Sequence, residues 1–335
     1  MNILGFDASA LGNHEFDSGT AAVGGIIRPD VSSGTRLNQV RWFGAQFPYL
    51  SANLDFSADT ALNPTFTASI EDSESFRTTP ANLASAAGAN KLAPAAIINR
   101  GGELFGVVGA TTPLLASISS PGQTKVKNPG AGSNNMTQLA SILQPVIDQL
   151  LTAGVNRVIL VTHLQQIALE QELVPLLRGV EVAIAGGSDT LLADATDVLR
   201  PGDAAGGPYP ILANNANGDP AVIVSTDGQY SYVGRLVIQF DAAGRVVPGS
   251  VETGVSGAYK TDDEGVLAVW GNLTDPFLPG TKGALVKTLT DAVKAVVIAK
   301  DSNVFGNSDV FLEGRRATVR TEESNLGNVS ADANL

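Results

Sequence analysis

Residues 136–153 read MTQLASILQPVIDQLLTA, and this stretch decides the fold class. Its apolar side chains recur at helical spacing, and the glycine that follows at position 154 is a typical helix terminator. Residues 158–162, VILVT, then have the β-branched, apolar composition of a buried strand. Because a parallel crossover needs a connection of this length, the stretch predicts a helix that leads into a parallel strand.

The same order repeats directly downstream and has a hairpin upstream. We expect a helix over 165–177 and a strand over 180–185 that runs into the turn GGSDT at 186–190. Residues 95–99 and 103–109 are short β-rich runs on either side of a Gly-Gly turn, which is typical of a hairpin. Strands that alternate with helices predict an α/β fold built on layers around a mainly parallel sheet.

The other predicted elements extend this pattern to both ends of the chain. They are a helix over 20–27, a strand over 47–54, a surface excursion over 57–92, strands over 209–214, 221–226 and 230–240, a helix over 281–300 and a strand around 310–312. The length of 335 residues suggests about two domains.

Charge and composition exclude several classes of protein. The chain has 21 Lys+Arg against 33 Asp+Glu, a net charge of -12, and no basic block of the kind that follows nucleic-acid phosphates. We therefore expect no nucleic-acid partner. With no cysteine, any metal must bind through His, Asp, Glu, Asn or Gln, which suits a hard or borderline cation such as Zn, Mn or Fe.

The sequence also bears on the membrane and on the compartment. No stretch reaches the roughly 18 unbroken apolar residues of a membrane helix, so we expect no membrane span. The first residues show no basic n-region followed by an apolar h-region. The abundance of small residues, Asn and Thr, with few Lys and no Cys, favours an extracellular or periplasmic protein.

Three polar clusters stand at the predicted ends of strands. Residues 12–17, GNHEFD, contain Asn13, His14 and Asp17, and the later clusters contain His163 and Asp189. In an open α/β sheet the ends of parallel strands meet at one edge, where ligands bind. Amide oxygen, imidazole nitrogen and carboxylate together are plausible ligands for Zn, Mn or Fe. A metal there would polarise a phosphoryl oxygen, and His14 could protonate a leaving alkoxide while Asp17 holds its tautomer.

Each of these residues also has a purely structural interpretation. Asn13 and His14 could form an Asx turn with a helix cap. His163 could be a buried histidine satisfied by the backbone. Asp189 could cap a helix that follows it, and Asn53, at the end of its strand, could either fix a loop or contact a substrate.

Five motifs together resemble a known family. They are, in order, GNHEFD at 12–17, FPYLSAN at 47–53, VTH at 161–163, YVGRL at 232–236 and VRTEESNLGN at 319–328. The chain resembles over nearly its whole length the secreted 5'-nucleotidase and cyclic-phosphodiesterase branch of the calcineurin-like metallophosphoesterases. The resemblance implies a layered α-β-β-α sandwich, two divalent metal ions, and hydrolysis of nucleotides or other phosphate esters by a metal-bound hydroxide.

The resemblance also implies roles for individual residues and a division into domains. Asn13 and His163 become ligands of one metal, Asp189 a ligand of the other, and His14 with Asp17 the pair that acts on the leaving group. Asn53 falls on a motif position near the substrate. Residues 1–275 would form the metallophosphoesterase domain, 276–300 a linker helix and 301–335 the start of a C-terminal domain.

The sequence departs from the family pattern in three places. The family begins with two metal-binding strands, whereas Met1 aligns inside the family pattern, so we expect the sandwich to lack its first strands and the chain to be part of a longer protein. Gly187 stands where the family has a histidine. Only the beginning of the C-terminal domain follows residue 301. The leading hypothesis is a metallophosphoesterase, and the alternative is a degenerate, non-catalytic member with a structural or cell-surface role.

Overall fold

The protein forms two compact units in a computed structural model. The structure describes residues 1–83, 88–301, 304 and 306–335. The units are Met1–Asp275 and Pro276–Leu335.

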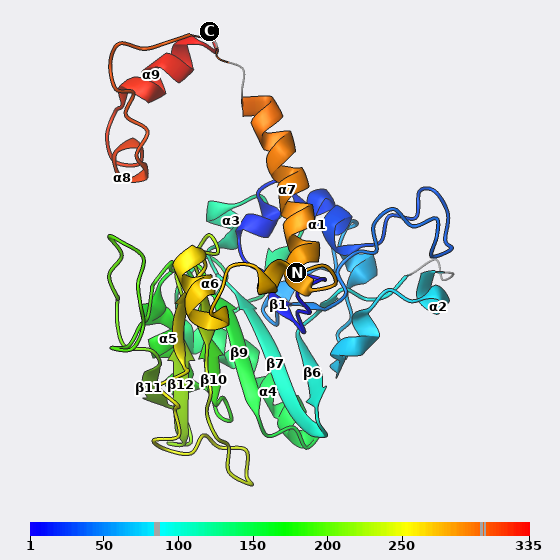
Figure 1. Cartoon of the computed structure of the whole chain (residues 1–335). Coiled ribbons are helices and arrows are strands. Elements are labelled where there is room, and N and C mark those ends of the chain that lie inside the picture. Colours follow the sequence, from blue (N-terminus) through cyan, green and yellow to red (C-terminus); the bar gives the residue numbers. More distant parts are fainter. Residues whose placement is uncertain (84–87, 302–303, 305) are drawn as a thin grey trace. The chain divides into compact units, whose positions relative to one another are not determined.

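A seven-stranded mixed sheet forms the centre of the first unit (Figure 1). Its strand order is β11-β12-β10-β9-β7-β6-β4, with bounds β4 Glu71–Asp72, β6 Ala95–Arg100, β7 Glu103–Thr111, β9 Val158–His163, β10 Val182–Ile184, β11 Ile211–Asn214 and β12 Pro220–Val224. Strands β7, β9, β10 and β12 run parallel, whereas β6 and β11 are antiparallel to their inner neighbours β7 and β12. The α/β class is confirmed, with the correction that the sheet is mixed.

The predicted hairpin and crossover are both present. Strands β6 and β7 pair in antiparallel register around Gly101 and Gly102, whose φ values of 62° and 91° suit glycine in a tight turn. Helix α4, Met136–Thr152, then connects β7 to the parallel strand β9. The helix prediction is confirmed to within one residue, although the chain contains Pro145 inside the helix.

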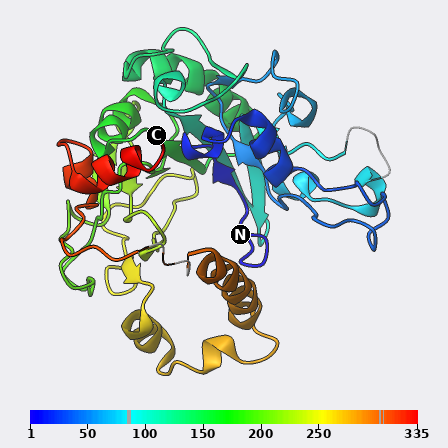
Figure 2. The same ribbon diagram turned by 90° about the horizontal axis from the view of Figure 1, so that it is seen from above.

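Helix α4 covers the sheet beside β7 (Figures 1 and 2). Its stripe of Leu139, Leu143, Ile147 and Leu150 is buried in the largest core cluster, together with residues of β7, β9 and β10. Burial of one such side chain stabilises the fold by about 1.5–3 kcal/mol. This packing holds the strands whose ends carry the polar clusters.

A second, smaller sheet leads into the motif at 12–17. Its strands are β1 Ser9–Ala10, β2 Tyr49–Leu50 and β5 Leu92–Ala93, in the order β1-β2-β5 and all parallel. The strand predicted over 47–54 is therefore divided into β2 and a separate short strand β3, Leu54–Asp55, which pairs with β8, Lys125–Val126. Helix α1, Thr20–Ile27, has the predicted bounds and buries Val23 and Ile27.

The remaining elements of this unit are short. They are η1 His14–Phe16, η2 Asn63–Thr65, η3 Ser73–Phe76, α2 Pro80–Leu83, α3 Leu115–Ile118, α5 Ile167–Leu173, η4 Val174–Leu176, β13 Tyr232–Arg235, β14 Gly257–Lys260 and α6 Asp263–Trp270. The helix predicted over 165–177 is thus α5 continued by η4, and the strand predicted over 230–240 is limited to β13. The excursion over 57–92 contains several of these turns, and its residues 84–87 lie outside the described part of the chain.

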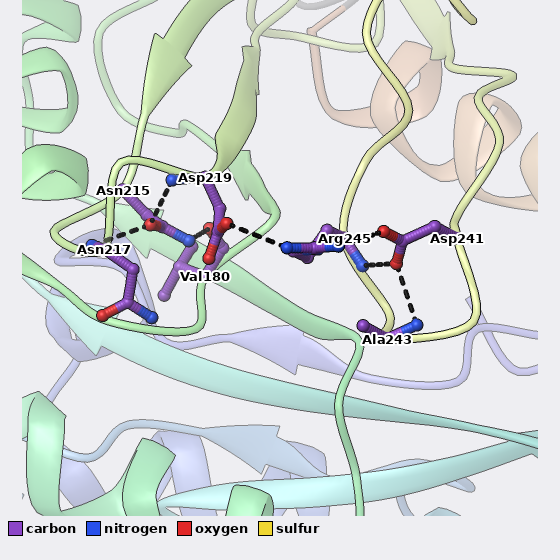
Figure 3. A network of polar contacts seen from close by, with 7 residues as sticks. All are labelled: Val180, Asn215, Asn217, Asp219, Asp241, Ala243 and Arg245. Carbon is purple, nitrogen blue, oxygen red and sulfur yellow. Dashed lines mark hydrogen bonds and ion pairs between the residues drawn. The ribbon is translucent and has the colours of Figure 1, made fainter.

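A polar network ties the loop after β13 to the end of the large sheet (Figure 3). Arg245 contacts Asp241 through Nη2 at 2.8 Å and lies 3.7 Å from Asp219 through Nη1. Asp219 is linked through its amide to Asn215, which donates from Nδ2 to the carbonyl of Val180. Because the ion pairs are partly exposed, they fix geometry more than they stabilise the fold.

The second unit consists of helices joined by irregular segments. These are η5 Asp275–Phe277, which begins at the unit boundary, α7 Lys282–Asp301, α8 Arg316–Val319 and α9 Asn325–Asp332. Helix α7 confirms the long helix predicted over 281–300. The strand predicted around 310–312 is wrong, because these residues form an irregular segment. Within the described residues no helix has both the length and the apolar character needed to cross a membrane.

Candidate functional site

The motif at 12–17 lies where β1 gives way to the short helix η1. Leu11 donates its backbone N–H to Leu50 of the neighbouring strand at 3.1 Å, so the chain leaves the sheet after residue 11. Asn13 precedes η1 but makes no side-chain cap hydrogen bond, and only 4% of its surface is exposed. Its side chain is therefore available for a contact across the site, which disfavours the Asx-turn alternative.

Asn13 and His163 meet although 150 residues separate them. Asn13 Oδ1 lies 2.9 Å from His163 Nε2 and accepts a second hydrogen bond, at 2.7 Å, from Gln165 Nε2. His163 is the last residue of β9. Its Nε2 faces a side chain, so the alternative of a histidine satisfied by the backbone at that nitrogen does not apply.

Two glycines enclose the His163 ring. A Cβ atom at Gly12 would lie 2.7 Å from His163 Nδ1, and one at Gly187 would lie 2.7 Å from His163 Nε2. Burial lowers the pKa of His163, while Glu15 and Asp189 act to raise it and His14 to lower it. A neutral imidazole held in one orientation can act as a metal ligand.

His14 and Asp17 form a second pair on the solvent side of the motif. His14 Nδ1 lies 2.6 Å from Asp17 Oδ2, and the side chains are 76% and 50% exposed. Ser119 Oγ lies 2.8 Å from the other oxygen, Asp17 Oδ1. The hydrogen bonds from His14 and Ser119, in that order of size, lower the pKa of Asp17. Asp17 therefore stays ionised and fixes the Nδ1–H tautomer of His14, leaving Nε2 toward solvent.

Asp189 follows β10 in an unusual backbone conformation. Its φ of 51° is left-handed, and its carboxylate lies so close to Gly228 that a Cβ atom there would be 2.5 Å from Oδ1. The residues after Asp189 form no helix, so the helix-cap alternative is wrong. The charge of Asp189 acts to raise the pKa of His163, against the larger lowering effect of burial.

Asn53 lies inside the protein. It is 0% exposed, donates from Nδ2 to the carbonyl of Thr111 at 2.7 Å and accepts at Oδ1 from the Thr111 amide at 2.9 Å. Ser51 also donates to Oδ1, at 3.1 Å. These contacts favour the loop-fixing alternative over direct contact with a substrate.

The donor set fits a divalent ion in part. Asn13 Oδ1 and His163 Nε2 are an amide oxygen and an imidazole nitrogen that could hold such an ion, and their 2.9 Å separation in this structure is that of a hydrogen bond. Within the part of the chain that the structure describes, no group of three or more His, Cys, Asp or Glu side chains is arranged to hold a metal. Asn13 and His163 would supply two of the donors that such an ion needs.

Sequence reasoning missed two residues of the site. Gln165 has a left-handed φ of 79°, which turns its amide back toward Asn13. Ser119 donates to the carbonyl of Asn13 and lies beside Asp17. Gln165 carries one weak signal, its position two residues after His163. Ser119 lies in a loop and carries none, because only the fold brings α3 to the motif.

Comparisons with known proteins find relatives in sequence and in fold. A search against protein-family models finds no match. The chain is 27% identical over 335 residues to the 5'-nucleotidase of Mus musculus, covering 99% of this chain and 46% of that protein. It is also 27% identical over 338 residues to a trifunctional nucleotide phosphoesterase protein of Bacillus subtilis (strain 168), covering 100% of this chain and 19% of that protein.

Solved structures extend the likeness to the fold. The 5'-nucleotidase precursor from Thermus thermophilus superposes with a TM-score of 0.66 and 27% identity, over 98% of this chain and 50% of that one. The NAD nucleotidase of Haemophilus influenzae superposes with a TM-score of 0.52 at 20% identity, over 87% of this chain and 51% of that one, and this likeness concerns the fold alone.

The fold is therefore that of an α/β protein with mixed sheets, similar to the N-terminal domain of a 5'-nucleotidase. Over nearly its whole length the chain is a homologue, at about 27% identity, of the metallophosphoesterase part of the 5'-nucleotidase family. It spans about half the length, or less, of the relatives it matches.

Proposed function

We propose that this chain contributes the core of a metal-dependent phosphate-ester hydrolase that acts on nucleotides. The observation that carries the proposal is the convergence of Asn13 Oδ1 and His163 Nε2, 2.9 Å apart, with the His14–Asp17 pair in the same motif. The names of the relatives, 5'-nucleotidase and nucleotide phosphoesterase, support a nucleotide as substrate. The layered α-β-β-α arrangement is part of this proposal.

Asn13 and His163 would hold one divalent ion, Zn, Mn or Fe, and Asp189 would serve a second ion. Both residues of the first pair are neutral donors, because an amide carries no charge and burial lowers the pKa of His163. When bound, such an ion acts as a Lewis acid on a phosphoryl oxygen. The chain's own contribution is to hold these donors in place, His163 by the enclosing glycines and Asn13 by its backbone.

His14 would be the general acid for the leaving group. Its Nδ1 donates to Asp17 Oδ2, so that in the imidazolium form the second proton is on Nε2, which can deliver it to a departing alkoxide and leave the neutral Nδ1–H tautomer. Asp17 is ionised because His14 and Ser119 both donate to it and lower its pKa. The exposure of His14 lets it reach an ester bound from solvent.

The proposal includes the organisation and compartment of the protein. Residues 1–275 would be the metallophosphoesterase domain, 276–300 a linker helix and 301–335 the start of a C-terminal domain. The boundary between the two compact units after Asp275 supports this division. A relative found in snake venom supports an extracellular or periplasmic location.

A second candidate function is a non-catalytic structural or cell-surface role. Gly187 favours this role, because a glycine has no side chain that could bind a metal beside His163. A Cβ atom added at position 187 would lie only 2.7 Å from His163 Nε2. A ligand side chain from this position would need the His163 ring to move.

Metal content and ester hydrolysis separate the two candidates. The purified chain is expected to retain Zn, Mn or Fe and to hydrolyse p-nitrophenyl phosphate and AMP. We expect His14→Ala to lower kcat about 1,000-fold without loss of metal. The matched control is Gln149→Ala, an exposed residue of α4 remote in sequence from the motif. Absence of metal and of turnover in the wild-type protein would reject the catalytic proposal.

A further inference from the structure

Two hydroxyl groups hold the backbone on either side of the candidate ligand Asn13. Thr111 Oγ1 donates to the carbonyl of Leu11 at 2.7 Å, and Ser119 Oγ lies 2.7 Å from the carbonyl oxygen of Asn13 itself. We infer that Thr111 and Ser119 are positioning residues that set Asn13 against His163 and Asp17 against His14. The inference rests on the proposed function, because it concerns the same site.

Thr111 links three strand ends inside the protein. It is the last residue of β7 and pairs in parallel register with His163, the last residue of β9. Its backbone N–H and C=O are both bound by Asn53, from the segment after β2. Its hydroxyl reaches Leu11, from the segment after β1. The strand beside His163 therefore fixes the place where the Asn13 segment leaves the small sheet.

The Thr111 hydroxyl donates its proton to a single acceptor, the carbonyl oxygen of Leu11. Leu11 O is an acceptor only, so Thr111 must donate to it. The single hydroxyl proton of Ser51 then lies between Thr111 Oγ1, at 2.9 Å, and Asn53 Oδ1, at 3.1 Å. Leu11 and Thr111 are both 0% exposed, so water cannot replace the bond. Loss of this hydroxyl would leave the carbonyl two residues before Asn13 without its donor, which a buried polar group tolerates poorly.

Ser119 acts on the other side of the motif. Its single hydroxyl proton lies between Asn13 O, at 2.7 Å, and Asp17 Oδ1, at 2.8 Å. One side chain thus touches both the backbone of the metal-binding residue and the carboxylate that orients His14. This hydroxyl therefore contacts one residue of each pair.

Neither residue fits the role of a group that reacts. Thr111 is fully buried and cannot touch an ester, and the Ser119 hydroxyl is engaged with Asn13 and Asp17. Residues that orient metal ligands typically change metal affinity or activity by about 10–100-fold when they are replaced. This is the size of effect that the inference predicts.

Substitutions at Thr111 separate positioning from packing. Thr111→Val keeps the shape and removes the hydroxyl, whereas Thr111→Ser keeps the hydroxyl and removes a methyl group. Positioning predicts that Thr111→Val lowers metal affinity and kcat/KM about 10-fold or more and that Thr111→Ser stays near wild type. Packing alone predicts the reverse order, and that result would overturn the inference.

Thr65→Val is the matched control. Thr65 is also buried and donates from Oγ1 to a backbone carbonyl, that of Leu62 at 2.8 Å, but it lies outside the site. We expect it to lower stability about as much as Thr111→Val and to leave kcat/KM unchanged. If Thr111→Val does not fold, the half-buried Ser119→Ala decides instead: an unchanged kcat would overturn the inference, and a roughly 10-fold loss would support it.

The inference can be tested without activity, because the chain has only two histidines. Ring nitrogen–proton correlation spectra of the full chain report the tautomers of His14 and His163. Ser119→Ala is expected to change the His14 signals and Thr111→Val the His163 signals, while Thr65→Val changes neither. If the wild-type protein hydrolyses no ester, the proposed function fails, and these spectra still decide: unchanged signals in both site variants would overturn the positioning role.

Discussion

The candidate site has two halves that are built in opposite ways. The pair of His14 and Asp17 is local, three residues apart and exposed on both sides. The pair of Asn13 and His163 is remote in sequence, joined across 150 residues and placed by buried strands. The His14–Asp17 pair depends on one turn of backbone, whereas the Asn13–His163 pair depends on how the strands of the two sheets are placed against each other.

Because the two halves depend on different contacts, we expect them to respond differently to a change in the fold. A change in the sheet should disturb the buried half, and with it metal binding, before it disturbs the exposed half. A change at His14 or Asp17 alone should remove proton transfer and leave the fold intact. Three experiments, taken in decreasing order of expected effect, test whether the two halves respond independently.

Asp17→Asn should have the largest effect and should touch only the exposed half. The amide can donate to His14 Nδ1 and so favour the wrong tautomer, and we expect kcat to fall about 1,000-fold. Metal content and the urea midpoint should not change, because both side chains are largely exposed. Steady-state kinetics with AMP and metal analysis provide the measurement.

The matched control for this change is Asp291→Asn in α7, which breaks an exposed pair with Lys287 of similar local geometry. It should leave kcat unchanged. Loss of metal in Asp17→Asn would show that the two halves are not separable in the way described.

Glu170 should make the stability of the buried half depend on pH. It is 0% exposed and accepts from Thr162, the residue before His163, at 2.7 Å, and its Oε2 has no hydrogen-bond partner among the described residues. Burial raises the pKa of Glu170 from 4.5 to about 7. The folded state then binds more protons than the unfolded state between these values, so stability falls as pH rises through this window.

The expected loss is about 3 kcal/mol of unfolding free energy between pH 4.5 and pH 7, measured by urea denaturation. Glu181, whose pKa burial raises to about 8, contributes in the same direction, so the effect of Glu170 is read from the difference between wild type and Glu170→Gln. The control is Glu172→Gln, at an exposed position of the same helix. Its unfolding free energy should depend on pH as that of wild type does. If the unfolding free energy of Glu170→Gln fell with pH as steeply as that of wild type, Glu170 would not be the source of this pH dependence.

Gly12→Ala should give the smallest effect and should act on the buried half. The new Cβ atom would lie 2.7 Å from the His163 ring, so ring or backbone must shift, at a cost of about 1–3 kcal/mol. Gly25→Ala is the matched control, because this residue lies in helix α1 and a Cβ atom there meets nothing within 4 Å. We expect the control to stabilise the protein by about 0.5–1 kcal/mol.

Calorimetry and metal titration measure this last comparison. Gly12→Ala should weaken metal binding as well as stability, since it displaces the ring of the proposed ligand His163. Equal metal affinity in Gly12→Ala and wild type would mean that the His163 ring can move without consequence for the ion.

Much of the fold could be predicted because local patterns agree with the tertiary structure. The hairpin around Gly101 and Gly102, the helix at 136–152 and the strand after it follow from turn chemistry and periodicity, and all three are confirmed. The strand predicted around 310–312 is wrong, because a short apolar run becomes a strand only where a partner strand is available. The same dependence on partners divides the strand predicted over 47–54 into β2 and β3.

The local sequence is sufficient for the contact between His14 and Asp17, since these residues interact over a single turn. It also determined the α/β class, through the alternation of helical and strand periodicity. Only the tertiary structure decided that Asn13 meets His163, that Gln165 and Ser119 join them, and that Asn53 is enclosed. The physical reason is that contacts over a hundred residues or more depend on strand order and register, which no local pattern encodes.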